Sequence, residues 1–427
     1  MKILNSKFIL RWRNVDLEKI EFGVYFVGAF IAKVMTALVF FYLARFLTAA
    51  QMGEIELYNT TLSVITPVAS LQIWEACIRF LAKDTQDQQI TSNIIGVIVI
   101  QVAVLITLEL IFPQNHLFLT AIGVIITTFM AYYARAIDKI MYFKLPEILQ
   151  KVTFALLIFF FVEPTVLGYT DANFISYFIT ALIITVSLFH YLKCNVHYIN
   201  TKTMFKILSY TTPLVVNALG WWIITCVDRY VINFYYSEVE VGIYSIGIRV
   251  SQLLMLVLQN LYFVYQKRYI TLFEKQQSVD RTTGRFYFLV VFGMVILYLL
   301  LPQSFIKFTL GNSSEFVEGV KYYYLFILSV LYWACAVFYG IGYLVTNQTR
   351  GASTTTFIAA LINLVLNIIL VKHFGIIGAV ISTLIALFIW FFLRYHKQKD
   401  LLDYRFNIFE WGIFTFAHVL AFFQYLR

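Results

Sequence analysis

Residues 206–251 read KILSYTTPLVVNALGWWIITCVDRYVINFYYSEVEVGIYSIGIRVS, and the architecture of the chain can be worked out from this stretch. It holds two long apolar runs joined by a short acidic turn. Each run is long enough to cross a hydrocarbon core of about 30 Å as a helix. Asp228, Arg229 and Arg249 stand inside these runs. Because charge at membrane depth is costly, an ionisable residue there is a candidate for function.

The composition extends this pattern to the whole chain. Of 427 residues, 61% are hydrophobic and only 13% are charged, which is typical of an integral membrane protein. Apolar runs of roughly 20 residues recur along the sequence, whereas barrel strands would alternate apolar and polar residues over about 10. We therefore predict an all-α polytopic membrane protein with thirteen spans, the second over 57–79 and the last over 407–426.

The basic residues indicate the orientation in the membrane. Most Lys and Arg fall in alternate loops on one side, which places the N-terminus in the cytoplasm by the positive-inside rule. Residues 1–21 are too charged for a cleaved signal peptide and read as a cytoplasmic amphipathic lead-in. The net charge of +9 therefore reflects topology, and no nucleic-acid partner is expected.

Other chemistry is sparse in the sequence. The four cysteines have no CxxC spacing and the six histidines are dispersed, so we expect no metal and no other cofactor. Every predicted loop is short, which leaves no extramembrane domain for an active site. We therefore expect that the protein is not an enzyme.

The turn after the first span is repeated later in the chain. FLTAAQMGEIEL begins at Phe46 and YYSEVEVGIYSI begins at Tyr235, so that Gly53 and Gly242 align 189 residues apart. Six predicted spans separate the copies, which predicts two pseudo-symmetric six-helix lobes around a central cavity, as in transporters. The expected divisions are 22–205 for the first lobe, 206–396 for the second lobe and 397–427 for an extra hydrophobic helix.

Four spans carry a polar stripe at helical spacing, which favours a shared cavity. The alternative is that these residues only bind helices together, since neutral polar side chains commonly do so in membranes. Lys33 and Arg249 lie too far from an interface to reach water, and we predict that they are cavity cations. The stripes comprise Tyr25, Lys33 and Thr36; Ser63, Thr66 and Ser70; Asn217, Thr225 and Asp228; and Ser245, Arg249, Gln252 and Gln259.

Adjacent residues of a helix point about 100° apart. Asp228 is therefore expected to face inward and pair with Arg249, while Arg229 reaches toward the outer interface. We also expect Lys33 and Arg249 to face each other across the interface between the lobes. Such cations would suit an anionic ligand, because Arg offers a rigid fork to acceptor oxygens and Lys a mobile charge.

Further charged residues lie near span ends. Glu75 and Arg79 have the i, i+4 spacing of a helical ion pair, which is either structural or part of a gate. Arg45 is an interfacial anchor or an outer-gate residue.

Two prolines and two tryptophans lie inside predicted spans. Pro67 and Pro213 should kink their helices, with or without a role in gating. Trp221 and Trp222 lie mid-span, where one of them would stack on a sugar ring or pack between helices.

Three segments together resemble one known family. They are PLVVNALGWWIITCVDRYVINFYYSEVEVGIYSIG from Pro213, LARFLTAAQMGEIEL from Leu43 and ALINLVLNIILVKHFGIIGAVISTLIA from Ala360. They are similar to the polysaccharide transporter family of bacterial flippases for lipid-linked oligosaccharides (O-antigen or capsule repeat units). That family belongs to the multidrug/oligosaccharidyl-lipid/polysaccharide exporter superfamily. Its members usually have 12 or 14 spans, so the count of thirteen leaves open whether 407–426 crosses the membrane.

The resemblance implies a function. Undecaprenyl-pyrophosphate-linked repeat units would move from the cytoplasmic to the periplasmic leaflet of a bacterial inner membrane by alternating access. The implied partners are this glycolipid, membrane lipids, a polysaccharide polymerase and a chain-length regulator.

Two rival functions remain. A cation-coupled multidrug exporter of the same superfamily would centre on buried carboxylates, whereas the mid-span charges here are mostly basic. A membrane polymerase or glycosyltransferase would need a substantial loop with clustered acids or histidines.

Overall fold

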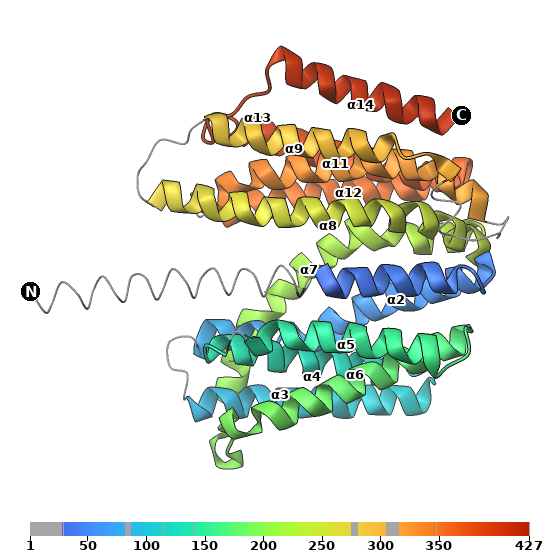
Figure 1. Cartoon of the computed structure of the whole chain (residues 1–427). Helices are drawn as coiled ribbons and strands as arrows, with labels where there is room; N and C mark the ends of the chain where they lie inside the picture. The colour runs from blue at the N-terminus through green and yellow to red at the C-terminus, as the bar shows by residue number, and fades with distance from the viewer. Residues whose placement is uncertain are drawn as a thin grey trace, which may run out of the picture. The chain divides into compact units, whose positions relative to one another are not determined.

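A computed structural model describes the chain over 28, 30–81, 87–113, 115–139, 141–274, 281–304, 316–346 and 348–426. Within these ranges every regular element is a helix (Figure 1). Nine of the helices are long and apolar enough to cross a membrane. The prediction of an all-α polytopic membrane protein is therefore confirmed. The lead-in predicted for residues 1–21 lies outside the described residues.

The helices form two compact units that do not follow the chain order. Phe40–Thr61 is grouped with the second half of the chain, and the first part of α7 (Thr201–Tyr235), up to Val216, is grouped with the first half. The domain boundaries expected from the sequence stay a prediction. Unit 1 comprises Met1–Val39 and Leu62–Val216, and unit 2 comprises Phe40–Thr61 and Asn217–Arg427.

Unit 1 is built around α4 (Leu117–Ala136), which packs against α3, α5 and α6. Gly123 lets α4 approach α6 closely, because a Cβ there would lie 2.7 Å from the Tyr177 Cβ. Between α5 and α6, buried Gln150 donates to Ser176 Oγ at 3.0 Å, a polar contact of the kind that links membrane helices. The remaining long helices of this unit are α3 (Gln88–Ile111), α5 (Met141–Phe160) and α6 (Val166–Leu188).

The predicted second span is broken in the structure. Helix α2 (Ala49–Ser70) ends three residues after Pro67, and Leu71 and Gln72 come next with left-handed φ values of 48° and 54°. The side chain of Gln101 donates to the freed carbonyl of Ser70 at 2.9 Å. By contrast, α7 continues through Pro213 from end to end. Only one of the two prolines therefore lies beside a break in its helix.

Unit 2 is built around α11 (Val317–Val345), which packs against α8, α9, α13 and α14. Of its membrane-crossing stretch, 94% is buried, as expected for a helix that is apolar on all sides. Tyrosine hydroxyls inside this core, such as that of Tyr287, donate to backbone carbonyls. The other long helices of the unit are α8 (Glu238–Glu274), α9 (Arg281–Leu299), α12 (Thr349–Phe374), α13 (Ile376–Gln398) and α14 (Ile408–Leu426).

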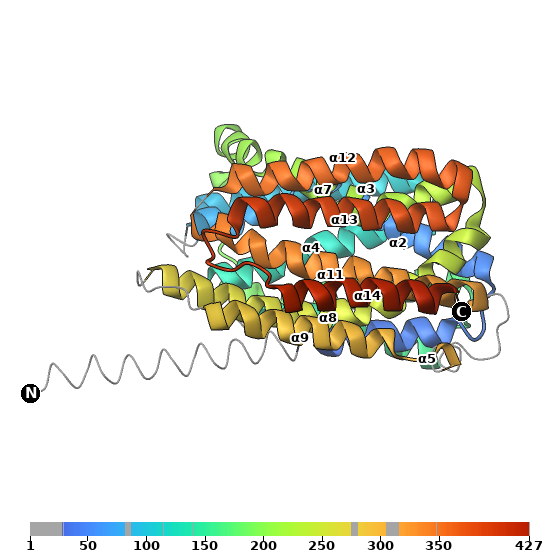
Figure 2. The same cartoon turned by 90° about the horizontal axis from the view of Figure 1, so that it is seen from above.

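The last helix lies along this bundle. In Figures 1 and 2 the axis of α14 runs in nearly the same direction as those of α9 and α11, and α14 contacts both helices. Its start is fixed by Glu410, which accepts hydrogen bonds from Tyr404 at 2.5 Å and from the Asn407 N–H at 2.8 Å. Helix α14 is therefore part of the bundle of unit 2, although it is not among the nine candidate membrane spans of the described residues.

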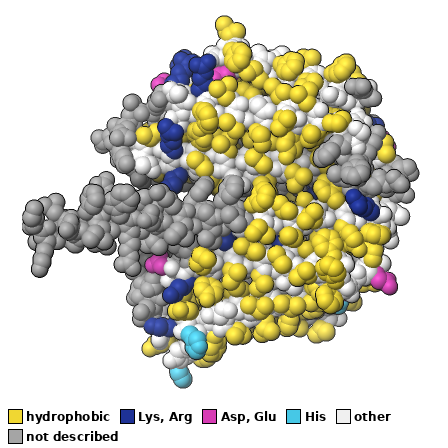
Figure 3. All heavy atoms as spheres, in the orientation of Figure 1, with side chains coloured by type: hydrophobic (Ala, Val, Ile, Leu, Met, Phe, Trp, Pro, Cys, Tyr) yellow, Lys and Arg dark blue, Asp and Glu magenta, His cyan; other side chains and the backbone are white. Residues whose placement is uncertain are grey.

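The surface fits a bilayer. On the face shown in Figure 3, hydrophobic side chains cover the middle of the helices and most charged side chains lie toward their ends. Leu110, Phe160 and Phe178 are among the large apolar side chains that are more than half exposed. Hydrocarbon, rather than water, is the solvent for such side chains.

Candidate functional site

The two copies of the repeated turn meet inside unit 2. A Cβ on Gly53 would lie 1.9 Å from the carbonyl oxygen of Glu238, and a Cβ on Gly242 would lie 1.9 Å from that of Ala49. Ala49 and Glu238 are themselves 189 residues apart. Each glycine of α2 and α8 thus packs on the first turn of the other helix. The contact is reciprocal, as a pseudo-twofold arrangement requires.

One turn further along α2, Glu56 joins two arginines. Its Oε1 lies 3.2 Å from Arg229 Nε on α7, and its Oε2 lies 2.5 Å from Arg249 Nη2 on α8. Glu56 and Arg229 are buried, with Arg229 only 3% exposed, while a quarter of the Arg249 side chain is accessible. A charge in this position needs a partner, because its desolvation is otherwise uncompensated.

Asp228 completes the network. Its Oδ1 accepts from Arg229 Nη1 at 2.8 Å, and its Oδ2 accepts from the hydroxyl of Tyr244. Two carboxylates and two guanidiniums therefore share one site, and their formal charges cancel. We call Glu56, Asp228, Arg229 and Arg249 the ion network. The first half of α2 is further held to α7, because Trp222 donates to the Thr60 carbonyl at 3.2 Å.

Two expectations about these residues are wrong. Asp228 pairs with its neighbour Arg229 rather than with Arg249, which pairs with Glu56. Arg229 is buried in the network instead of reaching the outer interface. The angle of about 100° between adjacent residues fixes only the directions of the Cα–Cβ bonds. An arginine side chain is long enough to fold back and meet the carboxylate of the preceding residue.

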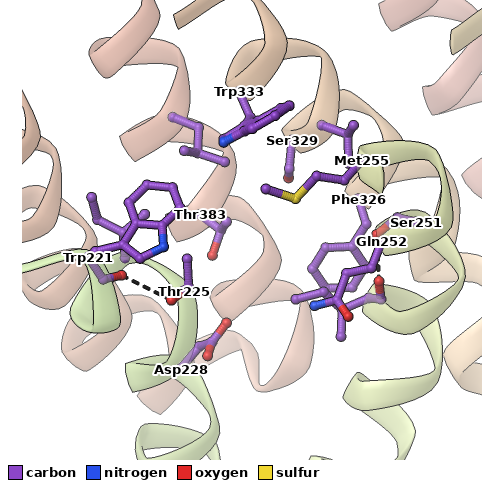
Figure 4. A pocket seen from close by; sticks show the side chains of 14 residues that line it. Trp221, Thr225, Asp228, Ser251, Gln252, Met255, Phe326, Ser329, Trp333 and Thr383 are labelled. Atoms are coloured by element: carbon purple, nitrogen blue, oxygen red, sulfur yellow. Dashed lines mark hydrogen bonds between the residues drawn. The ribbon is translucent and has the colours of Figure 1, made fainter. Parts of the chain in front are cut away.

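A pocket lies beside the network, between α7, α8, α11 and α13 (Figure 4). It encloses about 570 Å³ of empty space, including its open mouth. Three predicted cavity residues line it, namely Thr225, Asp228 and Gln252. Gln252 also accepts from Arg249 Nη1 at 3.5 Å, so the pocket and the ion network share side chains.

Other predicted cavity residues lie elsewhere. Lys33 is exposed on the first helix (Phe30–Leu43), and Thr36 donates back to the Ala32 carbonyl at 2.9 Å. Both belong to unit 1, so the facing of Lys33 and Arg249 stays a prediction. Asn217 is exposed on α7.

The predicted gate residues do not form the expected pair. Glu75 hydrogen-bonds with Tyr132 and lies near Arg135, whereas Arg79 lies over the Tyr210 ring at 5.8 Å. The Glu75–Arg79 ion pair is therefore absent from this described part of the chain. The reason is the break in α2 and the π-helical turn η1 (Cys77–Leu81), which remove regular i, i+4 spacing. Arg45 is exposed in the turn between the first helix and α2.

Glu56, the centre of the site, is not among the predicted site residues, although it lies within the first copy of the repeated turn. Two signals point to it. Glu56 extends the polar stripe of the second span by two turns from Ser63. It also lies 189 residues before Ser245, a member of the stripe on the eighth span. Tyr244, which holds Asp228, carries no comparable signal.

Comparisons with known proteins agree with this architecture. Residues 21–266 match the family described as Polysaccharide biosynthesis protein. The chain is 25% identical over 228 residues to a protein of Haloferax volcanii named probable low-salt glycan biosynthesis flippase Agl15, and the match covers 52% of this chain and 47% of that protein. It is 24% identical over 382 residues to the Lsg locus putative protein 1 of Haemophilus influenzae, covering 83% and 94%.

Solved structures share the fold. The lipid II flippase MurJ in an inward closed conformation superposes with a TM-score of 0.73 at 14% identity, covering 95% of this chain and 97% of that one. An inward-facing multidrug resistance MATE family transporter of the MOP superfamily superposes with a TM-score of 0.66 at 13% identity, covering 87% and 96%. These structures show that the predicted fold is shared, and the match over residues 21–266 shows the family. The Haloferax volcanii relative is named as a flippase, in agreement with the expectation that the chain is not an enzyme.

Proposed function

This chain belongs to the family of polysaccharide biosynthesis proteins, and we propose on that premise that it is a flippase for lipid-linked oligosaccharides. The proposed substrate is an undecaprenyl-pyrophosphate-linked repeat unit for O-antigen or capsule. It moves from the cytoplasmic to the periplasmic leaflet of a bacterial inner membrane, with the N-terminus of the protein in the cytoplasm. A polysaccharide polymerase and a chain-length regulator are the proposed downstream partners.

The observation that carries the proposal is the ion network. Arg249 is held by Glu56 at 2.5 Å, yet a quarter of its side chain remains accessible. A pyrophosphate group offers an arginine stronger and more numerous acceptors than one carboxylate does. Arg249 therefore exchanges Glu56 for the substrate, and this exchange loosens the contact between α2 and α8.

This exchange supplies the coupling that alternating access needs. Without substrate, the Glu56 bridge and the reciprocal glycine contact hold the two repeated turns together on the periplasmic side. With the pyrophosphate bound, one of these two restraints is lost. A ligand shifts such an equilibrium only through its differential affinity for the two states, and Arg249 provides that difference.

Lys33 supplies a second cation in this proposal. It completes the charge needed by a pyrophosphate group, while the polyprenyl tail stays in lipid. Outward movement of the anion runs down an inside-negative membrane potential, worth about 2.3 kcal/mol per charge per 100 mV. The potential therefore favours export.

The test uses proteoliposomes that contain an undecaprenyl-pyrophosphate-linked oligosaccharide. A glycosidase added outside reports how much substrate reaches the outer leaflet. We expect Arg249→Ala and Lys33→Ala to lower the transport rate at least about tenfold, whereas the exposed Arg405→Ala keeps it. Normal transport by both cation variants would contradict the proposal.

The rival multidrug exporter is tested in the same vesicles. Uptake of a lipophilic cation such as tetraphenylphosphonium under an ion gradient, without movement of the glycolipid, would favour the exporter. The network argues against it, because both carboxylates are engaged by arginines.

A further inference from the structure

The pocket between α7, α8, α11 and α13 has the chemistry of a sugar site. We propose that it binds one sugar ring of the glycan head group, next to the pyrophosphate. The proposal rests on the flippase function above and deepens it, since it separates the site for the sugar from the site for the phosphates. All residues that line the pocket belong to unit 2.

Aromatic side chains give the pocket its walls. Trp221 on α7 and Trp333 on α11 line it together with Phe326, and Figure 4 shows the two tryptophans bordering the same space. The apolar C–H face of a sugar ring packs on such flat rings. Trp333 is buried and Trp221 is about one-third exposed, so the first forms the floor and the second stands at the mouth.

Polar side chains also line this pocket. Ser329 is 6% exposed, and its buried Oγ has no hydrogen-bond partner among the described residues. A buried hydroxyl without a partner is rare and calls for an explanation. A hydroxyl both donates and accepts, which suits the hydroxyls of a sugar. Figure 4 shows Ser329 at the edge of the pocket between Met255 and Trp333.

The charge of the pocket argues against a cationic ligand. Asp228 is its acidic residue, but one oxygen accepts from Arg229 at 2.8 Å and the other from Tyr244. Its charge is therefore compensated within the protein. A polyprenyl chain fits no better, because it would leave Ser329 without a partner and desolvate Asp228. A neutral polyhydroxylated ring offers Ser329 a hydrogen-bond partner and does not place an apolar chain against Asp228.

Gln252 connects this pocket to the phosphate site. Its Oε1 lies 3.5 Å from Arg249 Nη1, while the same side chain lines the pocket. A sugar in the pocket is therefore adjacent to the cation that is proposed to hold the pyrophosphate. The sugar directly attached to the pyrophosphate is the one that this spacing selects.

The experiment measures binding of methyl glycosides to the purified full chain by saturation-transfer NMR. The panel holds methyl glucoside, methyl galactoside and the methyl glycosides of the two N-acetylhexosamines. At least one should bind with a Kd of roughly 1 mM. Ser329→Leu, which fills the pocket, and Trp221→Ala should each weaken that binding at least about tenfold.

Matched controls separate the pocket from the fold. Ser187→Leu on α6 and Trp411→Phe on α14 change exposed residues of the same types and should keep the affinity within about twofold. Should Ser329→Leu fail to fold, Ser329→Ala removes the hydroxyl alone and should still weaken binding several-fold. No binding by any glycoside at about 50 mM, or undiminished binding by both Ser329 variants, would overturn the proposal.

A second probe keeps this test distinct from that of the flippase function. Polyprenyl pyrophosphate without a sugar should bind the Ser329→Leu protein normally and lose affinity in Arg249→Ala, while the glycosides show the reverse. Displacement of the bound glycoside by tetraphenylphosphonium would overturn the sugar site in favour of a cation site. Loss of transport in Arg249→Ala with unchanged glycoside binding supports both proposals.

Discussion

Helices α2 and α8 carry the two copies of the repeated turn, and the two helices differ beyond that turn. Both begin with the reciprocal contact of Gly53 and Gly242. One turn later α2 has Glu56, whereas α8 has Ser245 at the equivalent place, where its hydroxyl donates to the Val241 carbonyl at 2.7 Å. Further on, α2 breaks after Ser70, while α8 continues to Glu274.

The difference matters for the proposed function, in which the contact made by Gly53, Gly242 and the Glu56–Arg249 ion pair acts as a latch between the two repeated turns. In a twofold arrangement, residue i of one copy contacts residue j of the other, and j contacts i. Two unchanged copies would therefore form the same ion pair twice, whereas here it forms once. Here the first copy keeps the acid, and the second supplies Arg249, whose counterpart in α2 is Thr60. The shared glycines bring the two turns into contact, and the divergent residues add the ion pair for which the substrate is proposed to compete.

The largest effect is expected from removing the acid of the first copy. Glu56→Ala leaves two guanidiniums with only Asp228 to compensate them, which costs about 3–5 kcal/mol of folding stability. Ser245→Ala at the equivalent position removes one neutral hydrogen bond, worth about 1 kcal/mol. Thermal unfolding of the purified proteins measures both. Equal losses from the two substitutions would mean that the copies are not functionally divergent.

A smaller and symmetrical effect is expected from the glycines. Gly53→Ala and Gly242→Ala each place a Cβ against a backbone carbonyl, and overpacking of this kind costs about 1–3 kcal/mol. Because the contact is reciprocal, the two losses should be similar, and the double variant should lose less than their sum. Gly220→Ala is the control, since nothing lies within 4 Å of its Cβ. A loss of stability in only one of the two glycine variants would contradict the reciprocal contact.

The smallest change in stability is expected at the break that follows Ser70 at the end of α2. Gln72 has φ of 54°, a region that costs a non-glycine residue about 1 kcal/mol. Gln72→Gly should therefore stabilise the protein slightly, whereas Leu261→Gly, at the equivalent place inside α8, should destabilise it by about 1 kcal/mol. Chemical unfolding in detergent measures whether each substitution raises or lowers the free energy of unfolding. A loss of stability in both would show that the break in α2 is held by side-chain contacts of Gln72.

Much of this architecture can be predicted from simple patterns in the sequence. Hydropathy alone predicts the helices, and the repeat at Gly53 and Gly242 predicts two related helix starts, which the structure brings into contact. The charges inside α7 and α8 correctly indicate where the polar site lies. These features depend on periodicity and on local composition, which a single sequence displays.

The features that the sequence does not reveal depend on how side chains fold. The pairing of Arg229 with Asp228 requires a long side chain to turn back on its own helix. The break at Leu71 and Gln72 contains no glycine and is stabilised by Gln101, which donates from another helix. The pocket proposed to bind a sugar is lined by residues from four helices. Such features arise from tertiary contacts, not from local preference.

Release of the latch between the two repeated turns by substrate can be measured as a distance. Thr48 and Ser237 are equivalent, exposed positions at the starts of α2 and α8, so spin labels on Thr48→Cys and Ser237→Cys report the separation directly, with exposed Cys194 replaced by Ser. Adding polyprenyl pyrophosphate should populate a longer distance in electron paramagnetic resonance, and Arg249→Ala should abolish that response. A single distance that the ligand leaves unchanged, in protein that still transports, would contradict release of the latch by substrate.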